Sequence, residues 1–260
     1  MQASRDTPAP PRAERIVALC GMHRSGTSMF ARFLHRSGID MGERLHVDRR
    51  TNPYGHYEDE DFLLVQRQEL ARTFDGEDYL VTEPFAASTR FRSEARALVE
   101  ARRAASRGAP WGWKDPRTTL FLDEWLRLLP ELRVVAMLRP PRDVLDSLCN
   151  RLRAYWSIRR KDHLLRVYAH YNATLLRFAR EHPERTSVVA LDALLASPAA
   201  VLTSLAERLE HPLDADAFRG LFDAKVMSRS RRALVIGNGA ALRAAEETYA
   251  ALLPLSLGRA

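Results

Sequence analysis

The chain has 260 residues, of which 46% are hydrophobic and 28% are charged, and its formal net charge at pH 7 is +7. This length and apolar content suffice for the core of one medium-sized domain and exclude a mainly disordered chain. No apolar run approaches the roughly 20 residues that a membrane-spanning helix needs.

The positive charge is carried almost entirely by arginine. Only three of the 40 basic residues are lysines, namely Lys114, Lys161 and Lys225. Such a bias makes any single arginine weak support for a binding site, whereas a lysine carries slightly more weight. The positive balance suits an anionic ligand and also nucleic acid, so charge alone does not decide between them.

The first 14 residues are polar and proline-rich and contain no apolar segment of a secretory signal. We therefore expect a disordered leader over residues 1–14 and a single domain over residues 15–260. The two cysteines, Cys20 and Cys149, lie in apolar segments and make neither a disulfide framework nor a metal-ligand cluster. These features predict a cytoplasmic protein without a membrane partner.

Short apolar runs alternate with amphipathic segments along the chain. Buried strands are predicted at residues 15–22, 132–139 and 186–191, and a short extended piece at residues 111–116. Helices are predicted at residues 26–36, 57–74, 90–107, 118–129, 141–156, 161–182 and 198–210, the last with Ser197 as N-cap before Pro198. The last fifty residues look helical and irregular, with a break at residues 237–239. This alternation predicts an α/β fold with a central parallel sheet and helices on both faces.

The segment between the first strand and the first helix has the composition of an anion site. It reads GMHRSGTS over residues 21–28. The first N–H groups of a helix and the helix dipole favour a negative ligand, and three hydroxyls add donors. The glycine spacing is that of a Walker A loop, but Thr27 stands where that motif needs lysine, and Arg24 supplies the cation before Gly26. The predicted fold is therefore a P-loop-like three-layer sandwich with the parallel sheet as its central layer.

These residues resemble the 5′-phosphosulfate loop of sulfotransferases that use 3′-phosphoadenosine-5′-phosphosulfate (PAPS). Residues 52–58 (NPYGHYE) resemble a stretch of the bacterial enzymes, and residues 113–117 (WKDPR) are similar to the KDP element of tyrosylprotein sulfotransferases and their bacterial relatives. Arg139 and Ser147 resemble the pair that binds the donor's 3′-phosphate, and residues 188–195 (VVALDALL) resemble a later strand-plus-acidic element. The resemblance runs in order over about residues 15–210.

The resemblance implies a transfer of the sulfuryl group of PAPS to an acceptor hydroxyl or amine, leaving adenosine 3′,5′-bisphosphate and requiring no metal. It implies Lys114 and Arg24 at the leaving oxygen, and Glu58 as general base with His56 as the alternative. The phosphosulfate would be bound by Arg24, Ser25, Gly26, Thr27 and Ser28, and the 3′-phosphate by Arg139 and Ser147.

No sequence pattern identifies the acceptor. We expect a small molecule or carbohydrate rather than nucleic acid, in a pocket lined by residues 42–57, 74–110 and 155–165. The basic run Arg229–Arg232 is either a loop that closes over the donor or a solvated charge run. The adenine contacts and the oligomeric state remain open.

Three other functions compete with this interpretation. A P-loop kinase is the runner-up, with Asp192 after an apolar strand as a Walker B carboxylate. Against it, lysine is missing after Gly26, and Arg139 and Ser147 suit a second phosphate group that ATP does not have. A nucleic-acid-binding module fits the charge, but the aromatic residues show no matching pattern. A non-catalytic relative is the third possibility.

Overall fold

The computed structural model describes residues 14–46, 55–77, 79–151, 158–221 and 239–258. Its centre is a single parallel β-sheet. Its strands are β1 (Ile16–Cys20), β2 (Trp111–Lys114), β3 (Arg133–Leu138) and β4 (Thr186–Ala190). They lie in the order β2-β1-β3-β4, and every neighbouring pair is parallel. The prediction of a central parallel sheet is confirmed, and residues 111–116 contribute a strand to it.

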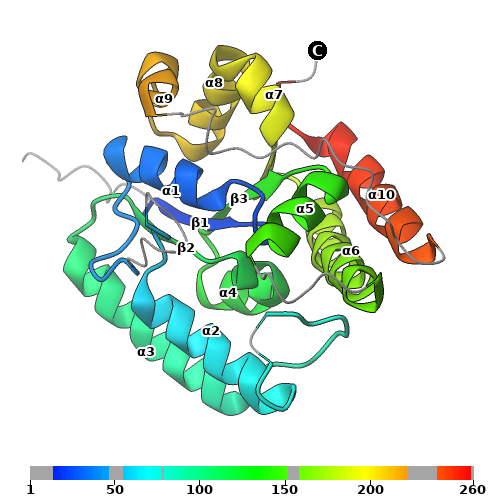
Figure 1. Cartoon of the computed structure of the whole chain (residues 1–260). Helices are drawn as coiled ribbons and strands as arrows, with labels where there is room; N and C mark the ends of the chain where they lie inside the picture. The colour runs from blue at the N-terminus through cyan, green and yellow to red at the C-terminus, as the bar shows by residue number, and fades with distance from the viewer. Residues whose placement is uncertain (1–13, 47–54, 78, 152–157, 222–238, 259–260) are drawn as a thin grey trace, which may run out of the picture.

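Helices cover both faces of this sheet (Figure 1). They are α1 (Thr27–Arg36), α2 (Glu60–Thr73), α3 (Thr89–Ser106), α4 (Leu122–Leu128), α5 (Pro141–Arg151), α6 (Ile158–Glu181), α7 (Leu191–Ala196), α8 (Pro198–Leu209), α9 (Ala215–Leu221) and α10 (Ala240–Leu252), with short 3-10 helices η1 (Pro116–Phe121) and η3 (Leu253–Leu255). The three-layer α/β sandwich is therefore confirmed.

Because side chains alternate along the buried strands, β1 contributes to two hydrophobic cores, one on each face of the sheet. Ile16, Ala18 and Cys20 of β1 join a cluster with residues of α2, α3, α4 and α6. Val17 and Leu19 point to the opposite face and join residues of α1, α7, α8 and α9. Because both faces are covered, these strands read as continuous apolar runs rather than alternating ones.

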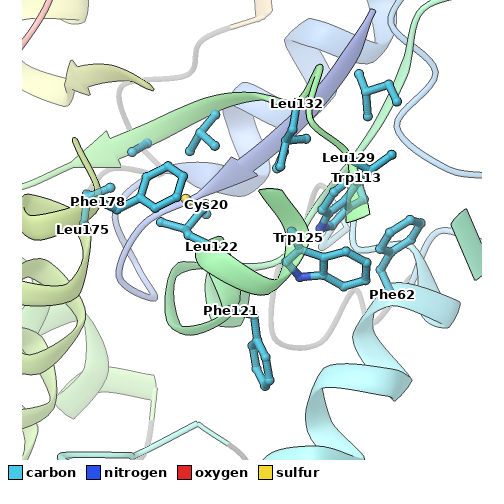
Figure 2. Close-up of a cluster of buried hydrophobic side chains, with 14 of the residues drawn as sticks. Cys20, Phe62, Trp113, Phe121, Leu122, Trp125, Leu129, Leu132, Leu175 and Phe178 are labelled. Carbon is cyan, nitrogen blue, oxygen red and sulfur yellow. The ribbon is translucent and has the colours of Figure 1, made fainter. Parts of the chain in front are cut away.

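The first of these two cores is rich in stacked aromatic rings (Figure 2). Phe62 of α2 stacks on Trp113 of β2, with ring centroids 4.3 Å apart and planes inclined by 10°. Trp125 of α4 tilts against Trp113 at 5.0 Å. The indole N–H groups are satisfied, since Trp113 donates to Thr118 Oγ1 at 3.0 Å and Trp125 donates to Gln66 Oε1 at 3.1 Å. This packing holds α2 and α4 against the end of β2.

Two predicted helices begin or divide differently from the expectation. The helix predicted over residues 57–74 starts at Glu60, because the Asp59 side chain accepts a hydrogen bond from Asp61 N and caps the helix there. The helix predicted over residues 118–129 is divided into η1 and α4. Asp115 caps η1 through Arg117 N, and Pro116 occupies its first turn.

Further differences lie in the second half of the chain. The long helix predicted from residue 161 begins at Ile158. The strand predicted over residues 186–191 ends at Ala190, and Leu191 begins α7. This helix was not predicted, because its apolar residues continue the apolar run of the strand. Ser197 occupies the N-cap position of α8, but its side chain makes no capping hydrogen bond. Residues 152–156 of a predicted helix and residues 237–238 of the predicted break lie outside the described residues.

The expected leader also lies outside the described residues, apart from Glu14. The carboxylate of Glu14 accepts hydrogen bonds from Trp111 Nε1 at 2.7 Å and from Arg103 Nε at 2.8 Å, so this residue is anchored. The buried Cys20 and Cys149 form no disulfide within the described ranges. In the part of the chain that the structure describes, no helix combines the length and the apolar character that crossing a membrane requires.

Close contact between β1 and β2 gives a test of the sheet. A Cβ added to Gly112 would lie 2.0 Å from the backbone oxygen of Val17. We expect Gly112→Ala to lower the free energy of unfolding by about 3 kcal/mol, because two hydrogen-bonded strands must separate. Gly220→Ala in α9 is the control, since its added Cβ meets open space and alanine favours a helix. Urea unfolding of both variants decides, and a wild-type value for Gly112→Ala would contradict this strand contact.

Candidate active site

The ends of three neighbouring strands bring the predicted site segments to one edge of the sheet. β1, β2 and β3 are parallel and end at Cys20, Lys114 and Leu138. The chain runs from β1 to β2 on one side and then crosses back past β1 to β3 on the other, and ligands in such sheets bind where the strand order reverses. The loop at residues 21–26, Lys114 and Arg139 therefore lie at this edge.

The loop after β1 is shaped by left-handed backbone conformations. Gly21 has a φ of 120°, and a Cβ at this position would lie 2.3 Å from the backbone oxygen of Met137 in β3. Gly21 N donates to Thr119 Oγ1 at 2.9 Å, which ties the loop to η1. Arg24 and Gly26 have φ values of 70° and 92°. The loop thus turns back over the sheet and leads into α1.

The polar groups of this loop fit an anion. Gly26 is the N-cap of α1, and no side-chain hydrogen bond caps this helix, so its first N–H groups remain for a ligand. Ser25 is 1% exposed, and its Oγ has no hydrogen-bond partner among the described residues. A buried hydroxyl without a partner costs free energy, which an anionic oxygen would remove. Thr27 is buried and Ser28 half-buried in the first turn.

The structure brings Arg24, Arg139 and Ser147 together. Arg24 Nε donates to Ser147 Oγ in α5 at 3.0 Å, and Arg139 Nη1 donates to the backbone oxygen of Arg24 at 2.9 Å. Tyr168 of α6 donates to the backbone oxygen of Arg139 at 2.7 Å. Arg139 and Ser147 are both about 5% exposed. Two segments 115 or more residues apart therefore form one basic, hydroxyl-bearing surface.

Lys114 and Glu58 form a buried ion pair, with Lys114 Nζ 2.7 Å from Glu58 Oε1. Lys114 ends β2, and Glu58 precedes α2, where its backbone oxygen accepts from His46 N at 2.7 Å. Burial alone would raise the pKa of Glu58, but the charges of Lys114, Arg117 and His56 and the lysine hydrogen bond together lower it. Glu58 is therefore ionised at neutral pH, as a general base must be.

His56 lies in the same segment as Glu58. It is 6% exposed, and its ring centroid is 5.3 Å from that of His46. Its charge contributes to the lowered pKa of Glu58, so the two side chains are close enough to interact. Both predicted candidates for the base thus lie in one place.

A second buried charged pair, which the sequence analysis did not assign, adjoins the first. The Asp115 carboxylate accepts hydrogen bonds from Arg117 Nη1 at 3.0 Å and from Gln66 Nε2 at 2.9 Å. Burial and the charge of Glu58 together raise the pKa of Asp115 to about 6, against the opposing charge of Arg117. Both residues stand in the WKDPR segment, two positions apart, and the fold adds Gln66 of α2 as a further partner of Asp115.

Two aromatic contacts were also missed. The ring of His23 lies 4.7 Å from that of Tyr79, and the guanidinium carbon of Arg117 lies 5.8 Å from the Tyr79 ring centroid. Tyr79 falls within residues 74–110, which were expected to line the acceptor pocket, but no sequence pattern singles it out. Residues 52–54 of the NPYGHYE stretch and the run Arg229–Arg232 lie outside the described residues.

One possible cation site lies elsewhere. Ligand atoms of Asp123, Glu181 and His182 lie within 4.8 Å of one another. Arg177 already binds both carboxylates, at 2.5 Å from Asp123 Oδ2 and 2.6 Å from Glu181 Oε2. The arginine therefore occupies the place that a metal ion would take between them.

The Lys114–Glu58 pair gives a prediction that does not require catalysis. Lys114→Met removes the hydrogen-bonded cation of a buried carboxylate, so we expect the free energy of unfolding to fall by about 3–5 kcal/mol at pH 8. The loss should be smaller at pH 5, because without lysine burial raises the pKa of Glu58 and the protonated form is then favoured. In the wild type the pH dependence of stability has the opposite sign. The pKa of Glu58 is lower in the folded protein than in the unfolded chain, so its ionised form stabilises the fold above the unfolded-state pKa. This contribution is lost as the pH falls through the folded-state pKa.

The double variant Lys114→Met/Glu58→Gln should recover most of the lost stability, because no buried charge then remains unpaired. Urea unfolding of the wild type, both single variants and the double variant at the two pH values measures the coupling. Simple addition of the two single effects would contradict a buried pair.

Three solved sulfotransferase structures share this architecture. The sulfotransferase domain of the Synechococcus PCC 7002 olefin synthase superposes with a TM-score of 0.57 at 14% identity, over 95% of this chain and 98% of that domain. The sulfotransferase domain from the curacin biosynthetic pathway gives 0.55 at 16% identity, over 96% and 94%. Sulfotransferase STF9 from Mycobacterium avium gives 0.52 at 16% identity, over 96% and 79%. At these identities the likeness concerns the fold alone.

No curated protein matches the sequence at a significant level. The sequence model of the sulfotransferase family, however, matches residues 17–215, which contain the loop after β1, the Lys114–Glu58 pair, Arg139 and Ser147. This match spans well over half of the chain and includes the strands that position the site. The chain belongs to the sulfotransferase family.

Proposed function

We propose that this protein transfers the sulfuryl group of PAPS to a hydroxyl or amine of a small-molecule or carbohydrate acceptor. One observation carries the choice of donor: Arg24 in the loop after β1 contacts Ser147, and Arg139 contacts Arg24. The first helix N-terminus and the Arg139–Ser147 pair thus adjoin, and PAPS bears anionic groups on both sides of its ribose. A nucleotide charged at only one end would leave half of this surface unused.

The loop residues would bind the phosphosulfate. Ser25 Oγ, the N–H groups of the first turn of α1 and the hydroxyls of Thr27 and Ser28 offer donors to its oxygens. Arg24 offers a permanent charge with a planar set of donors, which suits a clamp better than a proton donor. Arg139 and Ser147 would bind the 3′-phosphate.

PAPS supplies a sulfur atom bonded to a phosphate oxygen that leaves. During transfer the acceptor oxygen or nitrogen forms a bond to sulfur while that sulfur–oxygen bond breaks. Glu58 takes the acceptor proton, and Lys114 donates a hydrogen bond to the leaving oxygen, where negative charge grows. The two side chains are in contact, so proton acceptance and charge stabilisation occur side by side. His56 is the alternative base, because it lies beside Glu58.

The kinase alternative lacks its central features. Thr27 occupies the position of the Walker A lysine, and Asp192, the candidate Walker B carboxylate, is exposed in the first turn of α7. Family membership favours sulfuryl transfer over phosphoryl transfer. The acceptor is expected near Glu58, with the segment around Tyr79 as one wall.

Nucleotide binding separates the two functions. We expect calorimetry to show binding of adenosine 3′,5′-bisphosphate in the presence of EDTA and weak or absent binding of ATP with Mg²⁺. The physical reason is the second anionic group, which Arg139 and Ser147 are placed to bind. Binding of ATP with Mg²⁺ alone would reverse the assignment of the donor.

Turnover separates the roles of the residues. Lys114→Ala and Glu58→Gln should lower turnover by about 100-fold or more while leaving bisphosphate affinity nearly unchanged, since they act on charge that develops during transfer. Arg139→Ala should do the opposite and weaken bisphosphate binding by at least about tenfold. The measurements are hydrolysis or transfer of labelled PAPS and calorimetric affinity. Wild-type turnover in Glu58→Gln would exclude Glu58 as the base and leave His56, which His56→Asn then tests.

A further inference from the structure

A buried pair that the proposed reaction does not use lies beside the one that it does. Asp115 is 0% exposed and Arg117 is 7% exposed, and their closest side-chain atoms are 3.0 Å apart. Together with Lys114 and Glu58 they form a group of two cations and two carboxylates in the interior. Such a group is stable only when every charge is compensated.

Arg117 is held in place from several sides. Asp115 Oδ1 accepts hydrogen bonds from both the backbone N of Arg117, at 2.9 Å, and its Nη1. The other oxygen of Asp115 accepts from Gln66, whose amide oxygen in turn accepts from Trp125. The Tyr79 ring lies along the guanidinium. A network that fixes an arginine so firmly gives its charge a defined position next to the ion pair.

The proposed reaction places two demands on Lys114. It must donate to the leaving oxygen, and it is also the hydrogen-bond partner of Glu58. When the ammonium shifts toward the growing charge, the buried carboxylate of Glu58 loses part of its compensation. An unpaired buried carboxylate takes up a proton and can then no longer accept one from the acceptor.

We propose that Arg117, anchored by Asp115, is a positioning residue that keeps Glu58 ionised while Lys114 serves the leaving oxygen. This inference rests on the proposed function and deepens it, because it assigns a task to the second half of the WKDPR segment. Arg117 acts through Glu58 and does not touch the reacting atoms.

The charged groups around Glu58 support these separate roles of Lys114 and Arg117. Lys114 at the end of β2 contacts Glu58 directly, and the charges of Arg117 in η1 and of His56 in its own segment also act on its carboxylate, while Asp115 is the one negative neighbour among these described groups. Against burial, which raises the pKa of Glu58, the charge of Lys114 acts most strongly and that of Arg117 next. Arg117 is therefore the compensating charge that remains when Lys114 turns away.

The test is a titration of Glu58 in the free protein, so it does not depend on turnover. Glutamate labelled with ¹³C at the side-chain carboxyl is followed by NMR against pH, and the Glu58 signal is the one missing from Glu58→Gln. Arg117→Gln should raise the pKa of Glu58 by about one unit or more, and Arg117→Lys should restore most of the wild-type value. The same comparison in the Lys114→Met background should give a larger rise, because Arg117 is then the main compensating cation.

Arg92→Gln is the matched control, since this arginine is exposed on α3 and pairs with Glu124; it should leave the Glu58 titration unchanged. If Lys114→Met does not fold, the comparison in the otherwise unaltered chain decides alone. An unchanged Glu58 pKa in Arg117→Gln would overturn the proposal.

Kinetics then provide the second readout. The acidic limb of the turnover–pH profile should shift to higher pH in Arg117→Gln and lie near its wild-type pH in Arg117→Lys. The Michaelis constant for PAPS should stay nearly unchanged in both variants. A limb that stays in place would also overturn the proposal. Failure of the nucleotide-binding experiment would overturn the proposed function, whereas the titration of Glu58 reports on Arg117 in either case.

Discussion

The parallel arrangement of the four strands is the constraint on which the site depends. Because β1, β2 and β3 run the same way, their carboxyl ends must meet at one edge, whatever the distance along the chain. The register that sets Leu19 opposite Lys114 fixes the height of that lysine beside the loop after β1. Gly112 permits the close approach of β2 to Val17 in this register, and Gly21 permits the loop after β1 to lie against Met137 of β3. The strand contacts therefore position the site residues, and loss of these contacts would displace them.

Charge compensation is the second constraint, and it follows from the first. The edge of the sheet is buried under α2 and η1, so Lys114 and Asp115 enter an interior that disfavours ions. Each acquires a partner of opposite sign, Glu58 and Arg117 respectively. A buried pair contributes little net stability, yet removal of one partner is costly. Because of this asymmetry, each of the four charged residues depends on its partner to remain ionised in the interior.

Fold alone does not establish chemistry, since one architecture serves many reactions. Here the match to the sulfotransferase family covers the same segments that the geometry brings together. The loop after β1 provides an uncapped helix start and a buried hydroxyl, and the surface formed by Arg139 and Ser147 adjoins it. Sulfuryl transfer needs an anion site and a base beside it, and in the proposed function the Lys114–Glu58 pair provides the proton acceptor and a cation.

The strands, most of the helices and the anion-binding character of the loop after β1 could be predicted from the sequence. Apolar runs and amphipathic periods are local properties, and the order of motifs identified the family that the chain resembles. Only the folded chain shows that α2 starts at Glu60, that Lys114 pairs with Glu58, and that Gln66 donates a hydrogen bond to Asp115. The start of α2 depends on one hydrogen bond of the Asp59 cap, whereas the Lys114–Glu58 and Gln66–Asp115 contacts join residues 56 and 49 positions apart. No local pattern contains those distances, because they arise only when parallel strands align.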